Sequence, residues 1–226
     1  MNLIKQYDNL YHAAIDSIEN DTYETDSLID SINDKRLGVT LIIRPSQQVK
    51  NNIQTFLKAL KKFDSSQYFY PNSDIHITVM SIISCYDGFN LNKISISDYV
   101  SLVKKSLQNT EAFNLHFKGV TASKAGIMIQ GFPQNDTLNN LRDQLRKNFK
   151  NLPLEQSLDK RYSIQTAHAT VVRFRYELKN KMDVLKTIHE YKNHDFGAFT
   201  VKELEFVFND WCLRKQQTKI LEKFSI

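Results

Sequence analysis

The most constraining feature of this 226-residue chain is a repeat that occurs once in each half. In both halves a glycine opens an apolar stretch, a proline follows seven residues later, and a helical pattern leads to a histidine. The markers are Gly38, Pro45 and His76 in the first half, and Gly126, Pro133 and His168 in the second. The pattern predicts two strand–helix–strand units.

Each unit ends in the pattern H-x-T, within "IHITVM" and "AHATVV". Side chains two residues apart in a strand share a face, so His76 lies beside Thr78 and His168 beside Thr170. One interpretation is a half-buried strand with one polar face. The other is a site built from two imidazoles, which the repeated surroundings favour. A pseudo-two-fold arrangement of the units would place the two pairs face to face.

Hydrophobic periodicity divides the chain into alternating helices and strands. Helices are predicted over 1–20, 46–63, 97–109, 133–152 and 180–191. Strands are predicted over 37–45, 74–82, 112–123, 125–132 and 163–178, with a closing hairpin over 199–215 and 218–226. The order of these elements predicts an α+β protein.

Residues 1–35 differ from the rest of the chain in charge. They hold eight acidic and two basic residues, a net charge of about −6, so the remaining chain carries about +11. We therefore divide the chain into an acidic helical extension, 1–35, and a body, 36–226. A basic body favours anionic partners such as phosphates, although the same side chains can simply solvate a surface. The extension has an apolar helical stripe, so we expect it to dock on the body, either as a cover or at the mouth of a groove.

Composition excludes several classes of protein. The apolar runs are too short to span a bilayer, and the first twenty residues lack the pattern of a signal peptide. Cys85 and Cys212 lie far apart without metal-type spacing, which favours free thiols in a reducing cytoplasm. Asp74 shares a face with His76, so a zinc site is conceivable, but metal sites usually add carboxylates or further histidines, Asp74 and Asp87 are the acids near the motifs, and no metal or cofactor is expected.

Two imidazoles can divide the work of phosphodiester cleavage. A neutral imidazole takes a proton from the attacking water or hydroxyl, and a protonated one donates to the leaving oxygen. The threonine hydroxyls can hydrogen-bond to non-bridging phosphate oxygens as charge builds there. These four groups, His76, Thr78, His168 and Thr170, need no metal.

Two H-x-T motifs about ninety residues apart, each on a strand, resemble those of the 2H phosphoesterase superfamily. That group includes bacterial 2′-5′ RNA ligase-like proteins, cyclic phosphodiesterases and 2′-5′ oligoadenylate phosphodiesterases. "HATVVR" is similar to the motif H-x-T-x-x-R, and the resemblance extends over about 37–226. It implies a bilobal α+β fold, two pseudo-symmetric lobes of sheet and helices around a central groove, here with an extra N-terminal helix. It also implies metal-independent action on 2′,3′-cyclic phosphates or 2′-5′ linkages.

The resemblance assigns roles to individual residues. His76 and His168 would be the acid–base pair, Thr78 and Thr170 would hold the phosphate, and Arg173 would add charge to that grip. Strict alternation places Arg173 on the opposite face from His168, so it reaches the groove only if a bulge re-aims it. Three aromatic residues near the motifs are candidates for stacking on a base, or else for ordinary packing: Tyr70, Tyr86 and Tyr162.

Three functions remain open from the sequence. The first is a metal-independent phosphodiesterase acting on RNA ends or small nucleotides, with RNA 2′-5′ ligation as a related activity at the same phosphorus. The second is a non-catalytic protein of the same fold that binds RNA ends or nucleotides. The third is an unrelated α+β protein whose H-x-T pairs arose by chance. The default expectation is a cytoplasmic monomer without membrane partners.

Overall fold

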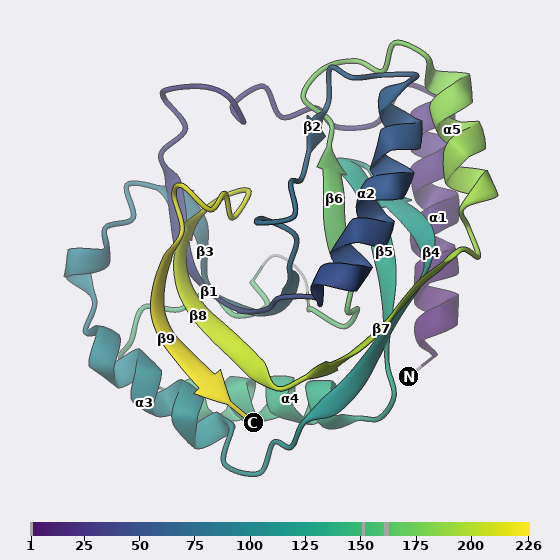
Figure 1. The fold of residues 1–226 in the computed structure, drawn as a ribbon. Helices are drawn as coiled ribbons and strands as arrows, with labels where there is room; N and C mark the ends of the chain where they lie inside the picture. Colours follow the sequence, from purple (N-terminus) through teal and green to yellow (C-terminus); the bar gives the residue numbers. More distant parts are fainter. Residues whose placement is uncertain (1, 151, 161–162) are drawn as a thin grey trace.

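Two antiparallel sheets form the body of the protein in the computed structural model, which describes residues 2–150, 152–160 and 163–226 (Figure 1). The four-stranded sheet has the order β3 (Ile77–Asp87), β1 (Arg36–Ile43), β8 (Glu203–Asp210) and β9 (Lys219–Ser225). The five-stranded sheet has the order β2 (Tyr68–Phe69), β6 (Ala169–Arg173), β5 (Gly126–Pro133), β4 (Phe113–Ser123) and β7 (Asp195–Val201). Each sheet therefore contains the strand that follows one of the two motif histidines.

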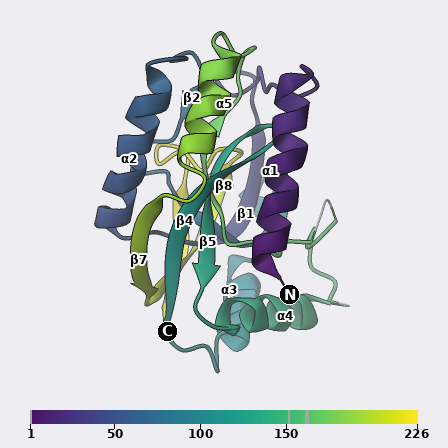
Figure 2. The ribbon, with the colours of Figure 1, turned by 90° about the vertical axis from the view of Figure 1, so that its right-hand side faces the viewer.

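Helices cover the two sheets unequally. The helices α1 (Leu3–Glu19), α2 (Gln47–Lys61) and α5 (Lys181–Glu190) lie together on the five-stranded sheet (Figure 2). The helices α3 (Ile96–Ser106) and α4 (Thr137–Phe149) pack on each other and on the four-stranded sheet, and the short 3-10 helix η1 (Leu91–Lys93) precedes α3 (Figure 1). No helix in the described ranges combines the length and the apolar character that a bilayer crossing requires.

The helix of each repeat packs on the sheet of the other repeat. The first repeat is β1–α2–β3, yet α2 contacts β7 and α5 in the five-stranded sheet layer. The second repeat is β5–α4–β6, yet α4 contacts β3 and α3 on the other side. Val49, Ile53, Phe56 and Leu57 make up most of the buried face of α2, and each such side chain contributes about 1.5–3 kcal/mol when fully buried. This exchange joins the two lobes through their cores.

The α+β class, the two lobes and the N-terminal helix are as the sequence predicts, but several strand bounds differ. The strand predicted over 163–178 forms pairs only from Ala169 to Arg173. The strand predicted over 199–215 is two strands, β7 and β8, which belong to different sheets and meet at Lys202. Because both are rich in β-branched and aromatic residues, periodicity alone does not reveal the point where the chain changes sheets. The short strand β2 was not predicted.

Candidate active site

A pocket of about 150 Å³ is lined by both sheets and by the loops beside them. The structure brings six of the eight predicted site residues into its wall: Tyr70, His76, Thr78, His168, Thr170 and Arg173. The two H-x-T motifs thus share one pocket, although they are far apart in the sequence. Both histidines lie immediately before the strand that carries the threonine of their motif.

The first imidazole is held by the backbone of its own motif. His76 Nδ1 lies 2.7 Å from the carbonyl oxygen of Asp74, and only 7% of the residue is exposed. A carbonyl oxygen only accepts, so Nδ1 carries the proton and Nε2 of the neutral ring is the free base. The Asp74 carboxylate accepts hydrogen bonds from Ser73 and from the backbone N–H of Lys215.

The second imidazole is held in a similar way by a side chain. His168 Nδ1 lies 2.7 Å from Thr166 Oγ1. In both motifs the residue two positions before the histidine contacts Nδ1, through its carbonyl oxygen at Asp74 and its hydroxyl at Thr166. Sequence reasoning missed Thr166, and the pattern T-x-H-x-T was the signal that could have found it.

Burial and nearby cations favour the neutral form of both imidazoles. Burial lowers the pKa of His76 to about 3, and the positive charges of Arg44 and Arg173 act in the same direction. Burial lowers the pKa of His168 to about 4, again with a contribution from Arg173. A bound anion would favour the charged form of each ring and raise both values.

Arg173 reaches the pocket through a β-bulge. Thr170 and Val172 pair with consecutive residues of β5, which leaves Val171 as an extra residue in β6. The extra residue reverses the alternation that follows it, so Arg173 shares a face with Thr170. The sequence-based condition for Arg173 to reach the groove is therefore met.

The β3 strand presents a row of hydroxyls that alternation does not predict. Register shifts against β1 leave Val79 and Ile82 as extra residues, so that residues three apart come to share a face. Thr78, Ser81 and Ser84 all line the pocket as a result. These serines add hydrogen-bonding groups to the wall that carries Thr78.

A buried arginine links the two motifs behind the pocket. Arg142 on α4 is 1% exposed, and its Nε donates to the carbonyl oxygen of Val79 at 3.0 Å. Its Nη2 donates to the carbonyl oxygens of Thr78 at 3.1 Å and Thr166 at 2.8 Å. One guanidinium group therefore fixes the backbone beside both imidazoles. Periodicity places position 142 on the buried face of a helix, but it does not identify these acceptors.

The three predicted tyrosines have different positions. Tyr70 lines the pocket but is 1% exposed, because its ring packs beside Tyr68 and His76. It therefore forms a wall and offers no exposed face for stacking. Tyr86 does not line the pocket: it is 39% exposed and its hydroxyl donates to Glu155. Tyr162 lies outside the described residues.

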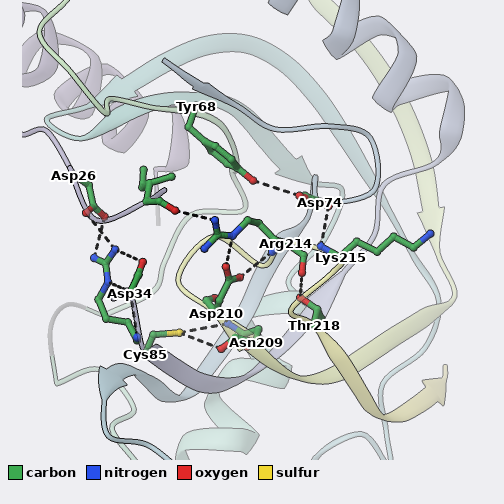
Figure 3. Close-up of polar contacts among 12 residues, drawn as sticks. Asp26, Asp34, Tyr68, Asp74, Cys85, Asn209, Asp210, Arg214, Lys215 and Thr218 are labelled. Carbon is green, nitrogen blue, oxygen red and sulfur yellow. Dashed lines mark hydrogen bonds and ion pairs between the residues drawn. The ribbon is translucent and has the colours of Figure 1, made fainter. Parts of the chain in front are cut away.

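Residues 211–218 form a turn that places Trp211 and Leu213 at the pocket. The Arg214 guanidinium bonds to Asp210 and to the carbonyl oxygen of Ile29, and the turn also contacts Asp74 through Lys215 (Figure 3). The network thus connects the turn to the first motif and to the acidic extension. The guanidinium carbon of Arg173 lies 5.6 Å from the centre of the Trp211 ring, which makes that ring part of the cationic side of the pocket.

The described residues contain no group of three or more His, Cys, Asp or Glu side chains that could hold a metal ion. Asp159, the acid at the pocket wall, is paired with Arg146, which lowers its pKa. His116 lies on β4 outside the pocket and pairs with Asp195 at 2.8 Å. Besides the imidazoles, hydroxyls and guanidinium group, the pocket lining includes the thiol of Cys85 and the amide of Asn209.

Solved structures with the same fold are known from several bacteria. TT0787 of Thermus thermophilus is 14% identical, with a TM-score of 0.58 over 83% of this chain and 96% of that chain. LigT of E. coli, complexed with 3′-AMP, is 12% identical, with a TM-score of 0.57 over 85% of this chain and 98% of that chain. A conserved protein of unknown function from Agrobacterium tumefaciens, ATU0111, is 14% identical, with a TM-score of 0.53 over 92% of this chain and 98% of that chain. At these identities the similarity establishes the fold.

No curated protein is similar enough in sequence to this chain to count as a match. The family model described as the AKAP7 2′5′ RNA ligase-like domain, however, matches residues 37–219. That range includes both motifs and most of the two sheets, and it leaves out α1. The match supports a 2H phosphoesterase or RNA ligase-like function. The chain therefore belongs to the AKAP7 2′5′ RNA ligase-like domain family, within the 2H phosphoesterase superfamily.

Proposed function

We propose that this protein is a metal-independent phosphodiesterase that acts on 2′,3′-cyclic phosphates or 2′-5′ linked nucleotides. The observation that carries the proposal is the single pocket shared by two imidazoles, two threonine hydroxyls and Arg173. Both imidazoles have Nδ1 occupied by a neighbour, which leaves Nε2 for the substrate. E. coli LigT, which shares the fold, has been crystallised with 3′-AMP and with phosphate, in accord with a nucleotide substrate.

The reaction follows from these groups. One imidazole removes a proton from water, and the water oxygen forms a bond to phosphorus. The bond from phosphorus to the 2′ or 3′ oxygen breaks, and that oxygen takes a proton from the second imidazole, which binds the substrate in its charged form. Thr78 and Thr170 donate hydrogen bonds to the non-bridging oxygens, and Arg173 balances the charge that builds there.

Two substrates in EDTA test this proposal directly. The full chain is incubated with adenosine 2′,3′-cyclic phosphate and with adenylyl-(2′→5′)-adenosine, and the products are separated by chromatography. We expect turnover of at least one substrate without a metal. Lack of turnover of both, or loss of turnover in EDTA with recovery on adding a divalent ion, would contradict the proposal. Joining of 2′ and 5′ ends by the same preparation would instead indicate ligation.

Histidine variants test the acid–base pair. His76→Ala and His168→Ala should each lower kcat by about 10² to 10⁴, the usual contribution of one positioned proton transfer. The double variant should lose little more than either single variant, because the two groups serve one transition state. His116→Ala is the matched control, since this histidine lies outside the pocket. A single pocket variant with the parent rate would rule out the paired mechanism.

A further inference from the structure

A second depression, of about 680 Å³, begins at the candidate active site and runs along α1. Four residues line both hollows: His168, Thr170, Arg173 and Trp211. The far wall is the side of α1 that carries Gln6, Asn9, Leu10 and Ala13. We call this depression the α1 groove. It is continuous with the pocket, and one of its walls comes from a helix outside the matched family range.

The position of α1 is tied to the second motif. The buried hydroxyl of Tyr7 donates to the carbonyl oxygen of Gly131 at 3.0 Å and accepts from the backbone N–H of Gly131 and of Ala167, each at 3.1 Å. Gly131 in turn lets the backbone of Ala167 approach β5 closely, since a Cβ at Gly131 would meet the Ala167 carbonyl oxygen at 2.0 Å. Helix α1, which forms one wall of the groove, is therefore anchored to Ala167, the residue before His168.

The lining of the α1 groove suits an uncharged ligand with a polar edge. Leu10, Ala13 and Met128 supply apolar surface, and the amides of Gln6, Asn9 and Gln165 supply donors and acceptors. Gln6 Oε1 is shielded from solvent and accepts no hydrogen bond from the described residues, although Gln6 Nε2 donates to Gln165. The two amides therefore stand together in the wall of the groove.

The charged residues that line the α1 groove limit how far a nucleic acid can extend along it. Among the described residues, Arg173 is the one permanent cation in the lining, and it lies at the active-site end, while Glu24 is an acid. A phosphate beyond the first would meet no cation from these residues. The volume, about 680 Å³, falls within the range of roughly 300–1,000 Å³ that small-molecule sites occupy.

We propose that the α1 groove is a subsite for the second nucleoside of a dinucleotide whose phosphate sits between His76 and His168. This assignment rests on the proposed function and adds a substrate class to it. The base lies against Leu10 and Met128, and its polar edge meets the amides of Gln6, Asn9 and Gln165. The acidic extension thus selects short substrates that end in an uncharged nucleoside.

A bulky residue on the groove side of α1 tests the subsite. Ala13 is exposed, so Ala13→Trp fills the groove without disturbing the core. The ratio of kcat/KM for adenylyl-(2′→5′)-adenosine to that for adenosine 2′,3′-cyclic phosphate should fall about tenfold or more, which corresponds to about 1.4 kcal/mol of lost binding. His12→Trp is the matched control: it adds the same ring to the next residue, which does not line the groove, and should leave the ratio unchanged. An unchanged ratio in Ala13→Trp would overturn the subsite.

A binding measurement separates this subsite from the proposed catalysis. Calorimetry on His76→Ala protein compares adenylyl-(2′→5′)-adenosine with adenosine 2′-phosphate, with and without Ala13→Trp. The dinucleotide should bind more tightly than the monophosphate, and Ala13→Trp should remove that advantage. Equal affinities for the two ligands would overturn the subsite. If the parent turns over neither substrate, the proposed function fails, and the titration still decides whether the groove binds a nucleoside.

Discussion

At the scale of single residues, the two motif imidazoles are set apart from His116 by the pocket that they share and by the desolvation that acts on both rings. His116, for comparison, pairs with Asp195 on a half-exposed strand. His76 and His168 instead lie where a positive charge is disfavoured, which depresses the pKa of each below the ordinary value of about 6.5. A bound anionic substrate offsets the cost of placing a positive charge on a buried ring. We therefore expect the charged imidazole chiefly in the complex with substrate.

This difference predicts the pH dependence of turnover. The pKa values of about 3 for His76 and about 4 for His168 describe the free protein. The active form needs one charged and one neutral imidazole. That form becomes scarcer as the pH rises above both values, so kcat/KM should fall between about pH 5 and pH 8. The phosphate raises both pKa values in the complex, so the optimum of kcat should lie at higher pH.

Initial rates on adenosine 2′,3′-cyclic phosphate in EDTA, measured across this range, check the prediction. His116→Ala should give a profile of the same shape. A kcat/KM that rises from pH 5 to pH 8 would show that neither depressed value governs the reaction.

At the scale of elements, β-bulges decide which side chains reach the pocket. The sequence predicts the strands that carry the two H-x-T motifs, and it predicts that each histidine and threonine share a face. It does not predict that Ser81 and Ser84 join Thr78, because bulge positions depend on pairing with β1, which is a property of the folded sheet. The family motif implies that Arg173 reaches the groove, which needs a bulge before it. Strand alternation alone would place Arg173 on the opposite face of the sheet.

The turn at 211–218 and the contacts of Arg142 were equally out of reach of periodicity. Both depend on acceptors that are distant in sequence, such as the carbonyl oxygens of Ile29, Val79 and Thr166. Patterns of 2 and 3.6 residues report which face of an element is buried, and they carry no information about which distant backbone group it meets. The sequence therefore predicts the two motifs of the candidate site, but not the turn and the arginine contacts that hold them in place.

Arg142 provides the prediction at this scale. Arg142→Lys keeps a charge but cannot reach three carbonyl oxygens at once, so acceptors beside both motifs lose their donors. The free energy of unfolding should fall by about 2–4 kcal/mol, measured by urea titration. Lys147→Met, an exposed change on the same helix, is the control. A stability within about 0.5 kcal/mol of the parent would mean that Arg142 does not link the motifs.

At the scale of the whole molecule, the charge contrast between the extension and the body appears as a set of ion pairs. Asp8 pairs with Lys192, Asp21 with Lys181, and Asp30 with Arg175. Such exposed pairs contribute only about 0–1 kcal/mol each. The apolar face of α1 and the buried Tyr7 hydroxyl therefore account for most of the docking energy of the helix.

Removal of residues 2–20 tests this docking. The deletion exposes the apolar surface that α1 covers, so we expect a lower melting temperature and lower solubility. The milder variant Tyr7→Phe leaves backbone groups of Gly131 and Ala167 without their partner and should cost about 1–3 kcal/mol in urea unfolding. Tyr176→Phe, at a residue that is 55% exposed, serves as the control. Unchanged stability in both the deletion and Tyr7→Phe would show that α1 contributes nothing to the fold.

The exchange of α2 and α4 between the two sheets has a consequence for the history of the chain. If the two repeats descend from one half-length ancestor, a single copy would leave its helix without the sheet on which that helix now packs. Two copies would bury both helices only by trading them, as subunits do in a domain-swapped dimer. The present chain has the form of such a dimer fused end to end, with one histidine contributed by each repeat.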